Sequence, residues 1–190
     1  MKPLKIFVEG RLSRDRREAH STHSAFIRDC VAKWFGRELN LLLNFQYIGG
    51  SSEFKNMAAD MRRAEEHHQV LLIIDADGNC AARKKEVEGF QIKEQLRFPF
   101  FLFPDNNSSG AIEILIEQCA TNKEILKCFT DYEACIGKKL DIEDKIFAYI
   151  TAVTGNKEEA KEKNRNFLNG SFNLDDACLE PLKKFLSQYV

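Results

Sequence analysis

The sequence has no apolar run long enough to cross a membrane and no excess of either charge. Its longest apolar runs, such as residues 98–103 and 70–74, are far shorter than the roughly 20 residues that span a bilayer as a helix. We therefore expect no membrane segment. Lys and Arg together number 28, Asp and Glu 29, and the net charge is -1. This balance excludes a uniformly basic surface that binds many phosphates, so any contact with nucleic acid must be local or metal-mediated.

The sequence also lacks a paired cysteine motif. No two of its six cysteines have the C-x-x-C spacing that is typical of metal and redox sites; they stand at Cys30, Cys80, Cys119, Cys128, Cys135 and Cys178. No signal peptide is recognised before them. We therefore expect reduced thiols in a cytoplasmic protein.

Proline and glycine are scarce, with 4 and 10 residues, and no segment is repetitive or of low complexity. These features exclude a disordered or fibrous chain. The 190 residues are 44% hydrophobic and include 15 Phe. A chain of this length buries roughly 70% of its unfolded surface, so we expect one hydrophobic core that contains the Phe residues and Trp34.

Short apolar runs alternate with segments in which apolar residues recur every three or four positions. The runs predict strands, and the periodic segments predict helices. The expected strands cover residues 4–8, 41–48, 70–74 and 100–103, and the expected helices cover about 25–35, 52–67, 82–96 and 110–119. Ser108 or Ser109 would cap the last of these helices. The alternation predicts an α/β fold with a mainly parallel central sheet flanked by helices on both faces.

The pattern becomes helical throughout after Thr121, with helices expected at 125–136, 142–153 and 179–189. No linker rich in Pro, Gly or Ser separates this part from the rest. We therefore expect residues 1–120 to form the α/β core and residues 121–190 to form a C-terminal helical extension packed on it.

Carboxylates follow two of the predicted strands. Glu9 follows the first strand, and Asp75 and Asp77 follow the third. Ligands of parallel sheets bind beyond the carboxyl ends of the strands. If the backbone stays extended, Asp75 and Asp77 lie on the same side with Cα atoms roughly 6.5 Å apart. Clustered carboxylates need a cation or a proton, and oxygen ligands favour Mg²⁺ or Mn²⁺.

These residues also carry a resemblance. The segments KIFVEG at residues 5–10 and IIDADG at residues 73–78, with the double glycine at 49–50, resemble the signature of the Toprim family of primases, topoisomerases and small nucleases. The resemblance implies a Toprim-like Rossmannoid fold. It also implies that Glu9 acts as a general acid or base or as a metal ligand, and that Asp75 and Asp77 bind Mg²⁺. Nothing resembles a primase zinc module or the active-site tyrosine region of a topoisomerase.

The later segment FPDNNSSGAIEILI at residues 103–116 resembles small, partly uncharacterised bacterial Toprim-like proteins related to OLD-type nucleases. By this comparison Glu113 is a further metal ligand, although it also suits the dipole of a helix N-terminus. The chain departs from the family in one respect. The acidic residue usual soon after the Glu-Gly pair is displaced to Asp15.

Basic residues and histidines offer further candidates. The cluster Arg11, Arg14, Arg16 and Arg17 follows the first strand and could bind nucleic-acid phosphates, or be a solvated loop. Lys145 could act in catalysis by neutralising a scissile phosphate, or be merely exposed. The histidine pairs His20 with His23 and His67 with His68 suggest zinc, but no cysteine stands at zinc-finger spacing.

Three functions remain open at this point. The preferred one is Mg²⁺- or Mn²⁺-dependent cleavage or phosphoryl transfer on nucleic acid. The second is a non-catalytic Toprim-derived module that binds nucleic acid or a partner, such as the ATPase of a defence or toxin system. The third is a haloacid-dehalogenase-like phosphatase, whose Asp-x-Asp motif normally follows the first strand whereas here it follows the third.

Overall fold

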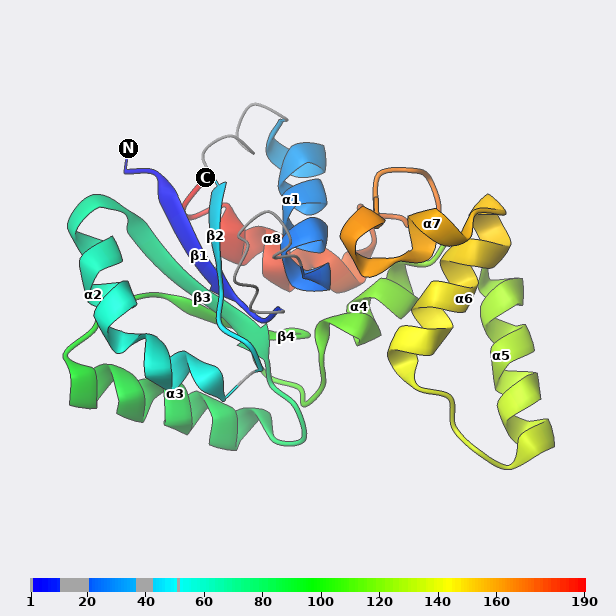
Figure 1. Cartoon of the computed structure of the whole chain (residues 1–190), viewed down its shortest axis with the longest axis horizontal. Helices are drawn as coiled ribbons and strands as arrows, with labels where there is room; N and C mark the ends of the chain where they lie inside the picture. The colour runs from blue at the N-terminus through cyan, green and yellow to red at the C-terminus, as the bar shows by residue number, and fades with distance from the viewer. Residues whose placement is uncertain (1, 11–20, 37–42, 51) are drawn as a thin grey trace.

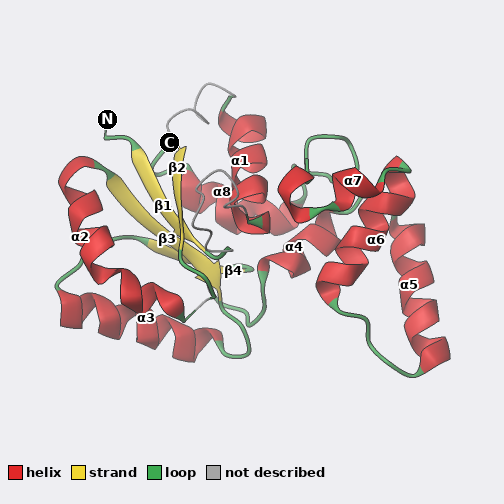
Figure 2. Cartoon of the chain, viewed as in Figure 1, coloured by secondary structure: helices red, strands yellow, loops and turns green. Residues whose placement is uncertain are grey.

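The computed structural model describes residues 2–10, 21–36, 43–50 and 52–190. Four strands form one sheet: β1 (Leu4–Val8), β2 (Leu43–Tyr47), β3 (Gln69–Asp75) and β4 (Phe100–Phe103). Every pairing is parallel, and the strand order is β2-β1-β3-β4 (Figure 1, Figure 2). The central strands are therefore β1 and β3, and their carboxyl ends lie at the same edge. The predicted α/β fold with a parallel sheet is confirmed.

Helices connect the strands and continue after them. Their bounds are α1 (Thr22–Phe35), η2 (Glu53–Met57), α2 (Ala58–His67), α3 (Cys80–Glu94), α4 (Ile112–Cys119), α5 (Lys123–Ile136), α6 (Ile142–Thr154), α7 (Lys157–Ala160), η3 (Glu162–Asn164), η4 (Ala177–Leu179) and α8 (Glu180–Leu186). Among the described residues, no helix is long and apolar enough to cross a membrane.

Helices cover both faces of the sheet, with α2 and α3 on one face and α1 and α8 on the other (Figure 1). Strand residues alternate between the two apolar clusters. Ile6 and Ile73 belong to the cluster beneath α1 and α8, whereas Phe7 and Leu72 belong to the cluster beneath α2 and α3. Because both faces of the central strands β1 and β3 are buried, these strands are mainly apolar, whereas the edge strand β2 is only partly buried and includes Asn44 and Gln46.

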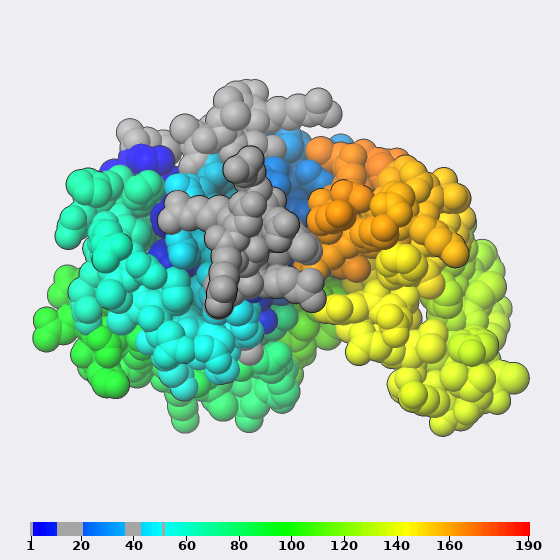
Figure 3. Space-filling view, in the orientation of Figure 1, coloured from blue at the N-terminus to red at the C-terminus, as the bar shows by residue number. Residues whose placement is uncertain are grey.

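The C-terminal segment contributes to the same core as the sheet. Phe167, Leu182 and Leu186 are fully buried in the cluster that includes Ile6 and Ile73. The indole Nε1 of Trp34 on α1 donates to the carbonyl of Leu174 at 2.8 Å. The α5–α6 hairpin, in contrast, projects from the body of the molecule (Figure 3). A domain boundary near residue 120 stays a prediction.

A β-bridge between Asp77 and Gly110 lies just before the start of α4. Asp77 N donates to Gly110 O at 2.8 Å, and Gly110 N donates to Asp77 O at 2.7 Å. Gly110 has φ 143°, a conformation that disfavours residues with a side chain, and an added Cβ would clash with Ile114 Cδ1. This bridge ties the loop after β3 to the start of α4.

The expected cap of α4 was wrong. The N-cap residue is Ala111, and no side chain of the cap residue accepts a hydrogen bond. Ser109 instead accepts a hydrogen bond from Cys80 N, at the start of α3, at 3.2 Å. The first amide of α4, on Ile112, donates to the Asp75 carboxylate.

Substituting Gly110→Ala should lower the free energy of unfolding by about 1–2 kcal/mol, because alanine is strained at this φ. Gly89→Ala is the matched control, since Gly89 lies inside α3 with open space around its Cα. That substitution should raise stability by up to about 1 kcal/mol. Urea denaturation measures both. A Gly110→Ala variant as stable as the Gly89→Ala variant would show that the bridge imposes no such constraint.

Candidate functional site

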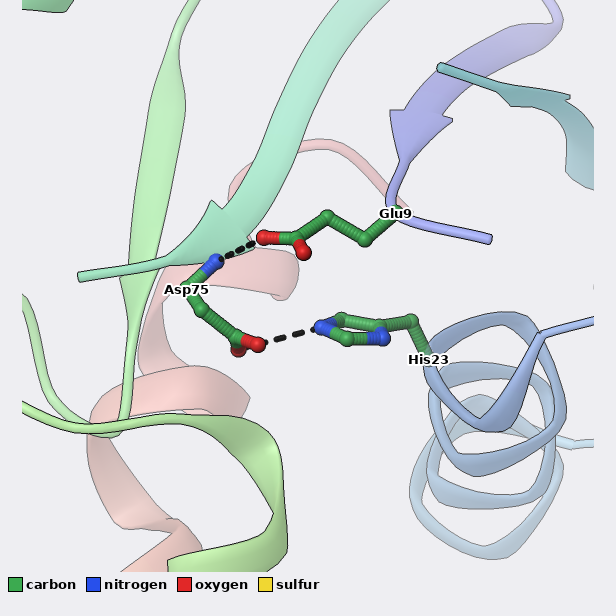
Figure 4. A group of neighbouring side chains, drawn as sticks. All are labelled: Glu9, His23 and Asp75. Carbon is green, nitrogen blue, oxygen red and sulfur yellow. Dashed lines mark hydrogen bonds and ion pairs between the residues drawn. The ribbon is translucent and has the colours of Figure 1, made fainter. Parts of the chain in front are cut away.

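Two carboxylates meet at the edge where β1 and β3 end. Glu9 directly follows β1, and Asp75 is the last residue of β3. These strands are paired neighbours, with Val8 opposite Ile73. Glu9 Oε1 accepts a hydrogen bond from Asp75 N at 2.7 Å (Figure 4). The pairing of β1 with β3 therefore brings the Glu9 and Asp75 carboxylates to the same edge of the sheet.

The Asp75 carboxylate receives donors from two helices. His23 Nε2 lies 3.0 Å from Asp75 Oδ1 (Figure 4), and Ile112 N donates to the same oxygen at 2.9 Å. His23 lies near the N-terminus of α1, and Ile112 is the first residue of α4. Helix N-termini carry unpaired amides and a partial positive charge, which favour an anion. One carboxylate oxygen therefore joins β3, α1 and α4.

Ser21 positions His23. Its side chain caps α1 by accepting from His23 N at 3.1 Å, and its hydroxyl donates to the backbone carbonyl of Glu9. The start of α1 is therefore tied to the end of β1. As a result, the imidazole of His23 lies beside the two carboxylates.

Burial and mutual repulsion shift the pKa values of this group. Burial, followed by the Asp75 charge, raises the pKa of Glu9 to about 7. The same two causes raise the pKa of Glu113, which is 8% exposed. Burial lowers the pKa of His23, but the neighbouring Asp75 carboxylate more than offsets this and raises it to about 9. At neutral pH His23 is therefore an imidazolium that donates to Asp75.

An open pocket of about 860 Å³ lies over these residues. Seven carboxylate residues line it, and none of its described lining residues is Lys or Arg; the seven are Glu9, Asp75, Glu113, Asp141, Glu143, Asp144 and Glu162. The last four come from the start of α6 and from η3. We call Glu9, Asp75 and Glu113, at the sheet edge, the acidic floor of the pocket. The acidic wall consists of Asp141, Glu143, Asp144 and Glu162 from the C-terminal segment.

Glu9, His23 and Asp75 are close enough to share one metal ion. Each has a possible ligand atom, and these three atoms all lie within 4.8 Å of one another. Ligands of one Mg²⁺ or Mn²⁺ ion, each about 2.1 Å from it, are separated by about 3–4 Å. Among the described residues, Glu9 Oε2 and Asp75 Oδ2 have no hydrogen-bond donor. These oxygens could bind a cation without breaking the existing hydrogen bonds.

Asp77 does not lie with Asp75, which corrects the expectation that both face one cation. The strand ends at Asp75, and Asp77 has φ 54°, so the backbone is not extended there. Asp77 Oδ2 accepts from Arg83 on α3 at 2.6 Å, and the Asp77 side chain is 48% exposed. The turn therefore directs Asp77 away from the acidic pocket and toward the start of α3, but its charge still contributes to raising the pKa of Glu9. Its role as a metal ligand stays a prediction.

Lys145 also lies away from the acidic pocket. Its ammonium lies 2.9 Å from Glu133 Oε1, with side-chain exposures of 13% and 4%. The hydrogen bond with Lys145 is the main reason that the pKa of Glu133 falls to about 2. Lys145 therefore joins α6 to α5 and is not among the residues that line the acidic pocket.

The four arginines Arg11, Arg14, Arg16 and Arg17 lie outside the described residues. Gly10 and Ser21, the described residues on either side of this segment, both line the acidic pocket.

Sequence reasoning considered His23 only as a zinc candidate and missed its place beside Asp75. The available signal was Ser21, a favoured N-cap residue immediately before the periodic segment of α1. A cap at Ser21 places His23 in the first turn, close to the sheet edge.

The comparisons add no relative. No family model, no curated protein and no solved structure matches this chain.

In chelator-treated buffer, the melting temperature of the wild-type protein should fall between pH 6.5 and 9.5. Because the folded-state pKa of His23 lies near 9, above its ordinary 6.5, its stabilisation is full below pH 6.5 and is lost as the pH rises through 9. The fall should exceed that of His23→Gln by roughly 5 °C. Calorimetric scans across this range measure it. Parallel profiles for the two proteins would contradict an imidazolium at this position.

Lys145→Met should lower the melting temperature by several degrees, because it leaves the buried Glu133 carboxylate without its closest cation. Lys139→Met is the matched control, since Lys139 lies 3.3 Å from the same carboxylate but is 85% exposed. Exposed pairs contribute little, so the control should change hardly at all. Equal melting temperatures, measured by circular dichroism, would refute the structural role of Lys145.

Proposed function

We propose that this chain is a Toprim-like protein that binds Mn²⁺ or Mg²⁺ at the sheet edge and cleaves or transfers phosphodiesters of nucleic acid. The observation that carries the proposal is the pair of carboxylates at the carboxyl ends of the two central strands, on the floor of an open pocket. Glu9 and Asp75 are also residues of the segments that resemble the Toprim signature.

The charge of the floor favours a cation. Two carboxylates about 4 Å apart repel each other by roughly 4 kcal/mol at an effective dielectric constant near 20. The His23 imidazolium faces Glu9, Asp75 and Glu113, and the Arg165 guanidinium interacts with Glu162, Glu143 and Glu113. When all seven carboxylates of the pocket are ionised, these two cations leave a net negative charge. Burial and, second, the Asp75 charge raise the pKa of Glu9 and Glu113, and a divalent cation would favour the ionised form of both carboxyl groups.

The donor set affects which metal is expected. Carboxylate oxygens suit Mg²⁺ and Mn²⁺, whereas an imidazole nitrogen suits transition metals. If His23 loses its proton and becomes a ligand, Mn²⁺ should bind more tightly than Mg²⁺. If His23 stays protonated, it would only orient Asp75 through Oδ1, and the two metals should bind similarly.

When bound, the cation would polarise a phosphoryl oxygen and activate water. Glu9 and Asp75 would hold it, with Asp75 fixed by its hydrogen bonds to His23 and Ile112. Glu113 is the further ligand that the resemblance implies. Glu9 is held through Oε1, so its Oε2 could bind the cation or exchange a proton with substrate or water. His23 and Ser21 would keep this arrangement rigid.

The negative charge of the acidic wall helps to distinguish a nuclease from a non-catalytic binding module. Without cations, its carboxylates would repel a nucleic-acid backbone. Metal binding must then precede substrate binding, and arginines of the 11–20 segment would supply the remaining positive charge. The same wall favours the second candidate, a non-catalytic Toprim-derived module that binds metal and a protein partner such as an ATPase.

Purified protein incubated with Mn²⁺ or Mg²⁺ and labelled single- and double-stranded DNA and RNA should cleave at least one of these substrates. Asp75→Asn and Glu9→Gln should lower the rate by about 100-fold or more, since each removes a metal-binding charge. Glu117→Gln is the matched control, because Glu117 lies on α4 one turn after Glu113 and does not line the acidic pocket.

The outcomes separate the candidates. Cleavage that survives in Asp75→Asn would contradict the site. No cleavage above the variants, with both metals and all substrates, would exclude an autonomous nuclease and favour the binding module. An equal loss in Asp77→Asn would favour the Asp75 and Asp77 ligand pair that the resemblance implies.

A further inference from the structure

Two cysteines that are far apart in the sequence meet beside the core. Cys119 is the last residue of α4, and Cys178 lies in η4 just before α8. Their sulfur atoms are 3.4 Å apart. The backbone holds the two segments together nearby, because Asn173 N donates to Cys119 O at 2.7 Å and Ala120 forms an antiparallel bridge with Phe172.

The two thiols differ in accessibility. Cys119 is 1% exposed, whereas Cys178 is partly exposed. Burial raises the pKa of the Cys178 thiol to about 11 and also raises that of Cys119. Both are therefore protonated near neutral pH and react slowly. Cys178 should react first with an external disulfide, because it is the more exposed residue of the two.

The remaining cysteines provide comparisons. Cys30 is fully buried on α1 and close enough to Cys119 and Cys178 for their charges to raise its pKa further. Cys128 and Cys135 are exposed on α5. Oxidation controlled by accessibility alone would therefore modify Cys128 and Cys135, whereas oxidation controlled by proximity would join Cys119 to Cys178.

We propose that Cys119 and Cys178 are a redox modification site that forms a reversible disulfide with a low-molecular-weight disulfide such as oxidised glutathione. In the first step the Cys178 thiolate attacks the glutathione disulfide, which gives a mixed disulfide and releases one glutathione thiolate. In the second step the Cys119 thiolate attacks the Cys178 sulfur of the mixed disulfide and releases the second glutathione. Two protein thiols are oxidised, and one glutathione disulfide is reduced to two thiols.

The bond would fasten the end of α4 to the segment that leads into α8. A disulfide needs the sulfurs at about 2.05 Å, so they must approach by about 1.3 Å. It would close a loop between residues 59 positions apart, which restricts the unfolded chain and stabilises the fold. Because α4 begins at Ile112, which donates to Asp75, the bond would also fix the far end of the helix that borders the pocket.

The test uses the full-length reduced protein, freed of reductant and incubated with oxidised glutathione at pH 8.5 without denaturant. After acid quenching and alkylation, peptide mapping should find the Cys119–Cys178 linkage as the main protein disulfide. The melting temperature should rise by roughly 5 °C or more and return to its starting value with dithiothreitol.

Three variants serve as controls. The double variant Cys128→Ser/Cys135→Ser should form the same linkage and show the same rise. Cys178→Ser should show neither, and Cys119→Ala should stop at the mixed disulfide on Cys178. Linkage of Cys119 to Cys30, mixed disulfides confined to Cys128 and Cys135, or an unchanged melting temperature in the oxidised wild type would each overturn the proposal.

Discussion

The arrangement of the sheet edge depends on one carboxylate oxygen, Asp75 Oδ1. It accepts from His23 at the start of α1 and from the first amide of α4. The backbone amide of the same residue donates to Glu9 after β1. Four elements that are separate in the sequence thus meet at one residue, which itself ends the central strand β3. Removing this carboxylate would leave a buried imidazolium and a helix terminus without their acceptor.

The same edge brings together groups that repel one another. Glu9 and Glu113 lie beside the Asp75 carboxylate, and burial, followed by the Asp75 charge, raises the pKa of both. His23 compensates for one of these charges but not for all of them. Such an arrangement is costly for folding alone, and perturbed groups clustered in an open pocket are typical of functional sites. This imbalance is the physical basis for proposing a cation site.

The sequence allowed the parallel sheet to be predicted from local patterns, and it placed Glu9 near Asp75 on the condition that the first and third strands are neighbours. Apolar runs locate buried strands, and parallel topology brings their carboxyl ends to one edge. The placement of His23 depends instead on how α1 packs against the sheet, which no local pattern specifies. The turn at Asp77 depends on its bridge to Gly110, a residue 33 positions later in the chain.

Two further contacts were not predicted for the same reason. Ser108 or Ser109 was expected to cap α4 from its position in the sequence. The Ser109 hydroxyl instead accepts a hydrogen bond from Cys80 N at the start of α3, and Ile112 N at the start of α4 donates to the Asp75 carboxylate. Lys145 was left open as a catalytic or an exposed residue, but it is 13% exposed and pairs with Glu133 on the neighbouring helix α5. Pairings between distant elements are decided by tertiary packing, so spacing within one segment does not reveal them.

The central claim is that Glu9 and Asp75 form a cation site, and direct titration of Mn²⁺ into the metal-free protein tests it. Isothermal calorimetry, or electron paramagnetic resonance of free Mn²⁺, should detect at least one bound ion per chain. The affinity should fall roughly tenfold or more in Asp75→Asn and stay unchanged in Glu117→Gln. No saturable binding, or equal affinities in all three proteins, would contradict the account.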